Sequence, residues 1–240
     1  EVWKDAVNEA GLSYSKVSSF GQCVGKVPAS WVRQIDAMDH NKTIRYNFQG
    51  SAFAKDVKSY RHWVWQFVKR HFGPNDYFRV TDADLTSYAS LGSFDRTKMP
   101  GGFRPKNYQK IRGIWASLSP GYFRVMTSSN FTLCPRGDRA FSYRFYEAAL
   151  SYSIPVLKSL DVDLTSTVPI LKRSYPQMLR CIGYKYYTLD DGEPLVYRKD
   201  WAEENHRLFI KYQTFIEGDN TPPNCPKVEN LAAPPYSESY

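Results

Sequence analysis

Long apolar runs, clustered cysteines and runs of like charge are all missing from this 240-residue sequence. No segment approaches the ~18 consecutive apolar residues that a membrane-spanning helix needs, so we expect no part of the chain to cross a bilayer. The four cysteines are widely spaced and form no Cys/His cluster, which argues against a metal site. Although the net charge is +8, the sequence lacks the basic arm of many nucleic-acid-binding proteins, and nucleic acid is not an expected partner.

The composition is that of a folded, basic protein. Hydrophobic residues make up 42% and charged residues 23%, which is enough for a core in one large domain or two small lobes. Aromatic residues reach 16%, with 18 Tyr and 6 Trp, which fits either ordinary core packing or stacking on carbohydrate. The positive balance favours anionic partners such as phosphorylated ligands.

Early in the chain, a strand, a helix and a second strand follow one another. Residues 44–48 predict the first strand and residues 77–80 the second. Between them, residues 56–72 carry apolar side chains at helical spacing, with Asp56 as a candidate N-cap. Two strands joined by a helix over so short a stretch form a βαβ unit with parallel strands.

A second unit of the same kind is clearer. Residues 131–134 and 154–157 predict strands, and residues 142–152 predict the helix between them. Between the two units, residues 107–118 look helical, and Pro120-Gly121 is expected to end that helix. The repeated pattern indicates an α/β fold with a parallel sheet flanked by helices.

Two further helices are predicted outside these units. Residues 29–38 form a short one. Asp200 with Glu203 resembles a capping box at the start of a terminal helix, with His206 on its surface. After Gly218, five prolines in the last 22 residues predict an extended tail.

Polar side chains gather around the helix of the second unit. Arg136 lies in the turn after a strand, Ser142 begins the helix, and Arg144, Glu147 and Ser151 share the face opposite the apolar stripe. In open α/β sheets, ligands bind beyond the carboxyl ends of the strands, where a helix N-terminus favours anions. The arginines suit phosphate, Ser142 can donate a hydroxyl or cap the helix, and Glu147 suits neighbouring ribose hydroxyls, a set that fits a nucleotide diphosphate. The alternative is that Arg144 and Glu147 form only a solvated helix pair.

The same stretch resembles the signature of the exostosin-type glycosyltransferases, family 47. That signature consists of a short apolar strand, a Pro-Arg-Gly turn, a Ser-x-Arg helix start, a Glu-Ala pair and an Ile-Pro-Val strand. Here these parts are residues 131–133, Pro135-Arg136-Gly137, Ser142 with Arg144, Glu147-Ala148, and Ile154-Pro155-Val156. A weaker likeness in Tyr46-Asn47-Phe48-Gln49-Gly50-Ser51 and in the terminal helix extends the resemblance over roughly residues 44–216.

The resemblance implies a GT-B architecture, with two Rossmann-type lobes and the donor bound in the second. Only 43 residues precede the strand at 44, so the first lobe is expected to be reduced or partly removed. The expected organisation is residues 1–43 as the acceptor-side remnant, 44–216 as the nucleotide-sugar-binding domain and 217–240 as the tail. We expect a cytoplasmic location, including the host cytoplasm for a viral or microbial protein, or the Golgi lumen if an N-terminal anchor has been removed.

The implied reaction is an inverting transfer from a UDP-sugar to a hydroxyl of a glycan or glycoprotein acceptor, with xylose as our choice of sugar. The resemblance implies no tightly bound cofactor, and a divalent metal is not expected to be essential. Arg144 would stabilise the leaving group, and Glu147 would hold the ribose. The donor-binding set is Gly50, Ser51, Arg136, Gly137, Ser142, Arg144 and Glu147. The base stays open among Asp36, Asp39, His40, Asp82 and Asp84.

Two alternatives remain. Asp82-Ala83-Asp84 follows a predicted strand and reads as the metal-diphosphate ligand of the GT-A architecture, which would make the enzyme metal-dependent. The short first lobe would also suit a non-catalytic module that binds a nucleotide or a glycan.

Overall fold

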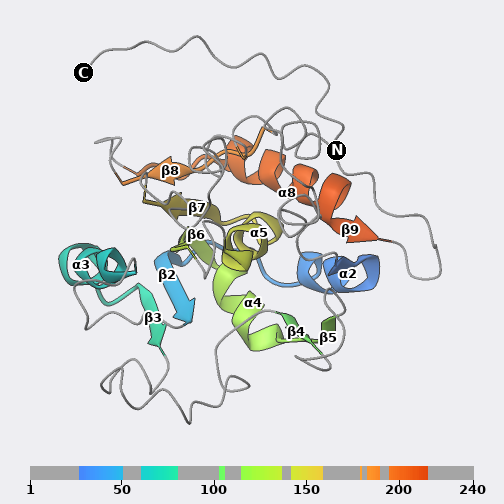
Figure 1. Ribbon diagram of the computed structural model, residues 1–240, viewed down its shortest axis with the longest axis horizontal. Helices are drawn as coiled ribbons and strands as arrows, with labels where there is room; N and C mark the ends of the chain where they lie inside the picture. Colours follow the sequence, from blue (N-terminus) through green and yellow to red (C-terminus); the bar gives the residue numbers. More distant parts are fainter. Residues whose placement is uncertain are drawn as a thin grey trace, which may run out of the picture.

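The computed structural model describes residues 27–50, 61–80, 103–105, 115–136, 142–158, 179, 183–189 and 195–215. Its centre is a five-stranded sheet in the order β3-β2-β6-β7-β8, in which every neighbouring pair is parallel (Figure 1). The strands are β2 (Ile44–Gly50), β3 (Tyr77–Val80), β6 (Ser129–Leu133), β7 (Ile154–Leu157) and β8 (Tyr187–Thr188). The predicted α/β class with a parallel, Rossmann-like sheet is thereby confirmed.

Helices cover both faces of this sheet. In Figure 1, α3 lies on one side of β2, and α4 and α5 lie on the other. The helices are α2 (Ala29–Asp36), α3 (His62–His71), α4 (Pro120–Thr127), α5 (Tyr143–Leu150) and α8 (Lys199–Gln213). Two small sheets accompany them: β1 (Val27–Pro28) with β9 (Thr214–Phe215), and β4 (Phe103–Pro105) with β5 (Trp115–Leu118).

Both predicted strand–helix–strand units are present. In the first, β2 and β3 pair in parallel with Asn47 opposite Tyr77, and α3 between them buries Val64 and Phe67. In the second, β6 and β7 pair in parallel around α5. The start of the first predicted helix, including its candidate cap Asp56, lies outside the described residues.

The connection between the two units was predicted wrongly. Trp115–Leu118 is a strand rather than the end of a helix, and Pro120-Gly121 begins α4 instead of terminating a helix. Proline suits the first turn of a helix because the N–H it lacks would have no partner there. The Pro-Gly pair was therefore a start signal, and α4 carries the buried residues Tyr122, Phe123 and Met126.

The start of α8 also differs from the prediction. Its N-cap is Arg198, without a side-chain capping bond, and Asp200 pairs with Arg198 at 3.3 Å. His206, expected on the surface, is buried, and its Nδ1 lies 2.8 Å from the carbonyl oxygen of Leu150. Because α8 packs against α5, the helix face that carries His206 meets another helix rather than water.

The two faces of the sheet differ in polarity. Against α3, the sheet presents Tyr46, Phe48, Phe131, Leu133, Ile154 and Val156, all buried. On the opposite face of β2, Asn47 and Gln49 are completely or almost completely buried. Asn47 Nδ2 donates to Thr132 Oγ1 at 2.7 Å, and Thr132 Oγ1 lies 2.7 Å from Ser153 Oγ. The alternation of a strand thus places a polar seam under α4 and α5.

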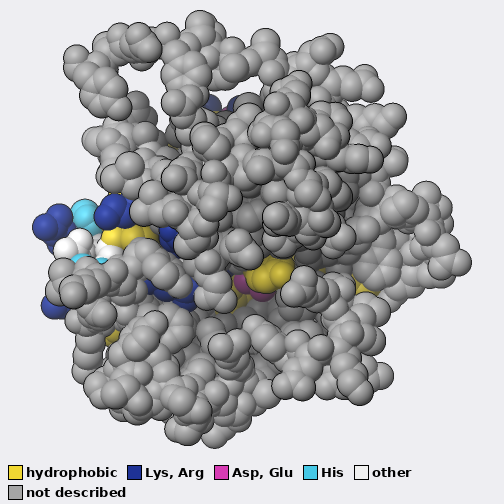
Figure 2. Space-filling view, in the orientation of Figure 1, with side chains coloured by type: hydrophobic (Ala, Val, Ile, Leu, Met, Phe, Trp, Pro, Cys, Tyr) yellow, Lys and Arg dark blue, Asp and Glu magenta, His cyan; other side chains and the backbone are white. Residues whose placement is uncertain are grey.

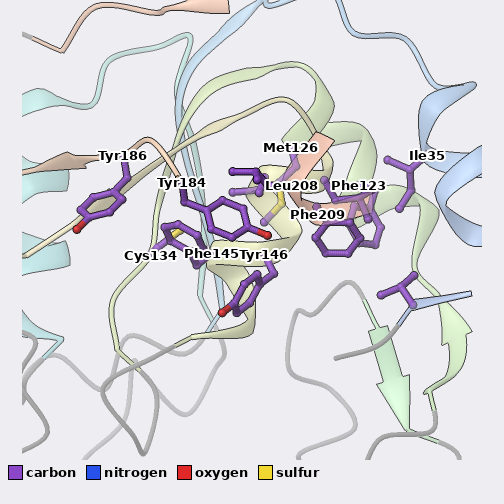
Figure 3. Packing of buried hydrophobic residues seen from close by; sticks show 14 of the residues in the cluster. Ile35, Phe123, Met126, Cys134, Phe145, Tyr146, Tyr184, Tyr186, Leu208 and Phe209 are labelled. Carbon is purple, nitrogen blue, oxygen red and sulfur yellow. The ribbon is translucent and has the colours of Figure 1, made fainter. Parts of the chain in front are cut away.

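A second core surrounds these helices. Figure 3 shows the rings of Phe145, Tyr146 and Tyr184 gathered at α5. Phe145 meets Tyr146 and Tyr184 edge to face, with ring centroids 5.5 and 5.4 Å apart. This packing, together with α4 and α8, surrounds α5 on several sides, and all its residues from Arg144 to Leu150 are buried.

Candidate functional site

The predicted donor-binding residues that the structure describes converge at the carboxyl edge of the sheet. Gly50 is the last residue of β2, Arg136 follows β6, and Ser142 immediately precedes α5. This edge is where open α/β sheets bind their ligands. Two members of the predicted set, Ser51 and Gly137, lie outside the described residues.

Ser142 is the N-cap of α5. Its backbone is extended, with φ −133° and ψ 136°, and its Oγ accepts a hydrogen bond from the Arg144 N–H at 3.2 Å. This is one of the two roles predicted for the serine. The cap fixes where the helix begins, and the first-turn N–H groups carry the partial positive charge of the helix terminus.

Arg144 reaches from α5 to the end of β2. Its Nε donates to the Gln49 carbonyl at 3.0 Å, and its guanidinium carbon lies 4.7 Å from the centroid of the Phe48 ring. Gly50 lies against the same guanidinium, so closely that an added Cβ would overlap Nη2. Arg144 is 8% exposed, so the alternative of a merely solvated Arg144–Glu147 helix pair is wrong.

Glu147 lies one turn further along α5 and is also buried, at 6% exposure. Its Oε2 accepts a hydrogen bond from the Tyr122 hydroxyl at 2.8 Å. Burial and the neighbouring Glu147 carboxylate raise the pKa of Tyr122 well above 10, although the Arg144 guanidinium opposes this. The Tyr122 hydroxyl therefore stays protonated at neutral pH and remains a donor to the carboxylate.

Gln49 closes this set of contacts. Its side-chain Nε2 donates to the Tyr122 carbonyl at 3.0 Å, while its own carbonyl accepts from Arg144. Neither Gln49 nor Tyr122 was predicted as a site residue. Gln49 stood within the segment Tyr46–Ser51 that carried the weaker family likeness, whereas Tyr122 followed the proline that was misread as a helix stop.

A third arginine, Arg61, contributes to this edge. Arg61 precedes α3, and its Nε donates to the Arg136 carbonyl at 2.9 Å, which links the segments that follow β2 and β6. Figure 2 shows Lys and Arg side chains gathered on the side of the molecule where α3 lies in Figure 1. Lys69 and Arg70 lie in the last turn of α3, at the end of that helix away from Arg61.

The base candidates that the structure describes lie at the other edge of the sheet. Asp36 Oδ1 is 3.3 Å from His206 Nε2, and the His40 ring packs edge-on against Tyr152, just before β7. Asp39 Oδ1 accepts from the backbone N–H of Asn41, ahead of β2. The length of β2, about 20 Å, separates this edge from Gly50. The remaining candidates, Asp82 and Asp84, lie outside the described residues.

Cys134 does not supply a nucleophile. It is a free and fully buried thiol whose Sγ donates to the Thr132 carbonyl at 3.3 Å. Burial raises the pKa of this thiol far above its ordinary value. Within the described part of the chain, no three His, Cys, Asp or Glu side chains are grouped so as to hold a metal ion. No described helix has both the length and the apolar character needed to span a bilayer.

Comparison with known proteins adds a relationship to these observations. Residues 115–221 match the family model of the RXYLT1 C-terminal domain, a range that includes α4, β6, α5, β7 and α8. The chain is also 32% identical over 88 residues to ribitol-5-phosphate xylosyltransferase 1 of Danio rerio. That match covers 37% of this chain and 18% of the relative, so the chain spans a small part of the relative's length. The two similarities support a relationship to the glycosyltransferases and do not single out the exostosin family.

Proposed function

We propose that this chain binds a UDP-sugar at the carboxyl edge of its sheet and belongs to an inverting glycosyltransferase of GT-B architecture. In this proposal, residues 44–216 form the donor-binding domain, residues 1–43 belong to the acceptor side and residues 217–240 form a tail. The acceptor is a hydroxyl of a glycan or glycoprotein. Xylose is the first sugar to test, because the matched relative is named a xylosyltransferase.

One observation carries the proposal: a buried arginine and a buried glutamate lie together behind a capped helix N-terminus at the ligand-binding edge of a parallel sheet. Arg144 and Glu147 are 8% and 6% exposed. Both fall within the residues that match the model of the RXYLT1 C-terminal domain. In such a water-poor environment, a charge acts on a ligand more strongly than it does in solvent.

Each residue then has a distinct task. Arg144, with Arg136 and the N–H groups at the start of α5, stabilises the diphosphate, and Glu147 accepts hydrogen bonds from the ribose hydroxyls. Gly50 allows the backbone to approach the donor without a side chain. The Gln49 carbonyl and the Phe48 ring already hold the Arg144 side chain in place. Its conformational entropy is therefore lost when the protein folds and not when the donor binds.

The proposed reaction is a single displacement. The acceptor oxygen forms a bond to the sugar C1 while the bond from C1 to the diphosphate oxygen breaks, and a base takes the acceptor's proton. UDP leaves with the bonding electrons, so negative charge grows on the diphosphate, where the arginines face it. The arginines supply this positive charge without a metal. Asp36, Asp39 and His40 are poorly placed as the base because they lie at the opposite edge.

The experiment is a thermal-shift screen with UDP, GDP, CMP and a panel of UDP-sugars, each with and without Mn²⁺, followed by transfer assays with the donors that bind. A ligand at a hundredfold excess over its Kd stabilises the folded state by about 2.7 kcal/mol. Stabilisation by UDP but not by GDP or CMP, independent of Mn²⁺, is the expected result.

Other outcomes would contradict parts of the proposal. Stabilisation only with Mn²⁺ would favour a GT-A-type enzyme that uses Asp82 and Asp84. Binding of UDP-sugars with neither hydrolysis nor transfer would favour a non-catalytic module. A failure of every nucleotide to bind would overturn the donor site.

A further inference from the structure

Tyr122 contacts Glu147 directly and is linked to Arg144 through Gln49. Its hydroxyl donates to Glu147 Oε2 at 2.8 Å, and its carbonyl accepts from Gln49 Nε2 at 3.0 Å. Gln49 in turn accepts from Arg144 Nε through its own carbonyl, at 3.0 Å. Since Arg144 and Glu147 lie one turn apart on α5, these contacts form a closed circuit through β2, α4 and α5.

The circuit is shielded from water. Gln49 is 1% exposed and Tyr122 is 5% exposed, comparable to the two charged residues that they contact. A buried carboxylate needs hydrogen-bond donors, and the Tyr122 hydroxyl supplies one that keeps its proton at neutral pH. Because the hydroxyl comes from α4 and the carboxylate from α5, this bond fixes the direction of Glu147 relative to the sheet edge.

We propose that Tyr122 is a positioning residue that sets Glu147 for the two ribose hydroxyls of the nucleotide, so that it acts on ribose recognition more than on the diphosphate. This inference rests on the proposed function, because it needs a nucleotide at this edge. It assigns a role to α4, a helix that the sequence motif does not include. Loss of the Tyr122 hydroxyl removes the donor that reaches Glu147 from α4, whereas Arg144 keeps its own bond to the Gln49 carbonyl.

The test is a comparison of UDP with its 2′,3′-dideoxy analogue, which keeps the base and the diphosphate but lacks both ribose hydroxyls. Their affinities are measured by calorimetry for the wild type and for Tyr122→Phe. Tyr187→Phe is the matched control, because Tyr187 is also buried and its hydroxyl donates to the Val196 carbonyl at the same 2.8 Å distance, on the α3 side of the sheet. Melting temperatures of both variants show how much stability each lost hydroxyl bond carries.

We expect Tyr122→Phe to weaken the binding of UDP by about tenfold, the size expected for loss of roughly one hydrogen bond. The binding of the dideoxy analogue should weaken by less than about twofold. Tyr187→Phe should change neither affinity. If the Tyr122 variant weakens both ligands equally, or leaves both unchanged, the positioning role is wrong while the donor site stands. If the folded wild type binds no UDP, the proposed function itself fails, and this inference fails with it.

A second pair of variants keeps the result interpretable if Tyr122→Phe is unstable. Glu147→Gln removes the charge that Tyr122 orients, and it should reduce the preference for UDP over the dideoxy analogue on its own. Added to Glu147→Gln, Tyr122→Phe should then have little further effect on that preference, because the two residues act through one contact. Fully additive effects of the two substitutions on the preference would overturn the inference.

Discussion

The guanidinium of Arg144 occupies the space where a Cβ atom of residue 50 would stand. An ideal Cβ built on Gly50 overlaps Nη2 of Arg144 and lies 3.0 Å from its Cζ. The backbone of Gly50 also has φ +152°, a conformation that other residues adopt rarely. Glycine at the end of β2 and arginine in the first turn of α5 are therefore coupled, although they lie 94 positions apart in the sequence.

Gly50→Ala is expected to displace the Arg144 side chain and to abolish most donor binding. Strain in the backbone and overlap with the guanidinium should together cost about 1–3 kcal/mol of folding stability. The measurements are chemical denaturation and UDP affinity. The double variant Gly50→Ala/Arg144→Ala should be more stable than the sum of the single effects implies, because alanine at 144 removes the overlap. Additive losses would show that the two residues are independent.

The strands, the fold class and the shared helix face of Arg144 and Glu147 could be predicted from local sequence patterns. Short segments rich in apolar and aromatic residues predicted β2, β3, β6 and β7 nearly at their observed bounds, because such residues favour strands. The fold class followed from their alternation with helices. Helical periodicity also placed Arg144 and Glu147 on one face, which holds in the structure.

Helical periodicity does not show which elements pack against the face of α5 that carries Arg144 and Glu147. Arg144 and Glu147 look like a surface pair in the sequence, and they are buried because α5 packs on the sheet with α4 and α8 around it. The role of Tyr122 depends on a contact across 25 positions, which no local pattern encodes. Whether Pro120 ends one helix or begins the next depends on the surrounding structure, because proline is compatible with both positions.

Arg144→Ala should reduce transfer by about 10²- to 10³-fold, the range typical for loss of one group that stabilises developing negative charge. The loss should appear mainly in kcat, because the charge on the diphosphate grows in the transition state. Circular dichroism should show an intact fold with a somewhat lower melting temperature, since the Gln49 carbonyl loses its partner. Arg207→Ala, on the exposed face of α8, is the control and should leave transfer unchanged. Turnover close to that of the wild type in the Arg144 variant would refute the assigned role.

Glu147→Ala should act on donor affinity more than on turnover. The carboxylate is proposed to bind the ribose, a part of the donor that changes little during the reaction, so KM should rise by about tenfold or more with kcat changed less. Steady-state kinetics with varied UDP-sugar distinguish the two effects. A variant in which kcat falls and KM is unchanged would assign Glu147 to the chemical step instead.

Lys42, at the opposite edge of the sheet, should make the stability of the protein depend on pH. Lys42 Nζ donates to the carbonyls of Thr127, at 2.6 Å, and Ser151, at 3.3 Å, at the carboxyl ends of α4 and α5. Burial lowers the pKa of Lys42 from 10.5 to about 7. Between these two values the unfolded chain holds a proton that the folded chain has lost, so this residue makes stability rise with pH across that window.

Lys42→Met should therefore remove a pH-dependent contribution of about 1–2 kcal/mol between pH 7 and 8.5, because a full one-proton difference corresponds to about 1.4 kcal/mol per pH unit. The comparison stops at 8.5 because an unfolded thiol ionises near pH 9.0, whereas burial keeps the Cys134 thiol protonated in the folded state. Urea unfolding of both proteins at several pH values gives the two curves. The free energy of unfolding of the wild type should rise relative to that of the variant as pH increases. Parallel curves would mean that Lys42 keeps its proton in the folded protein, held by the two helix carbonyls.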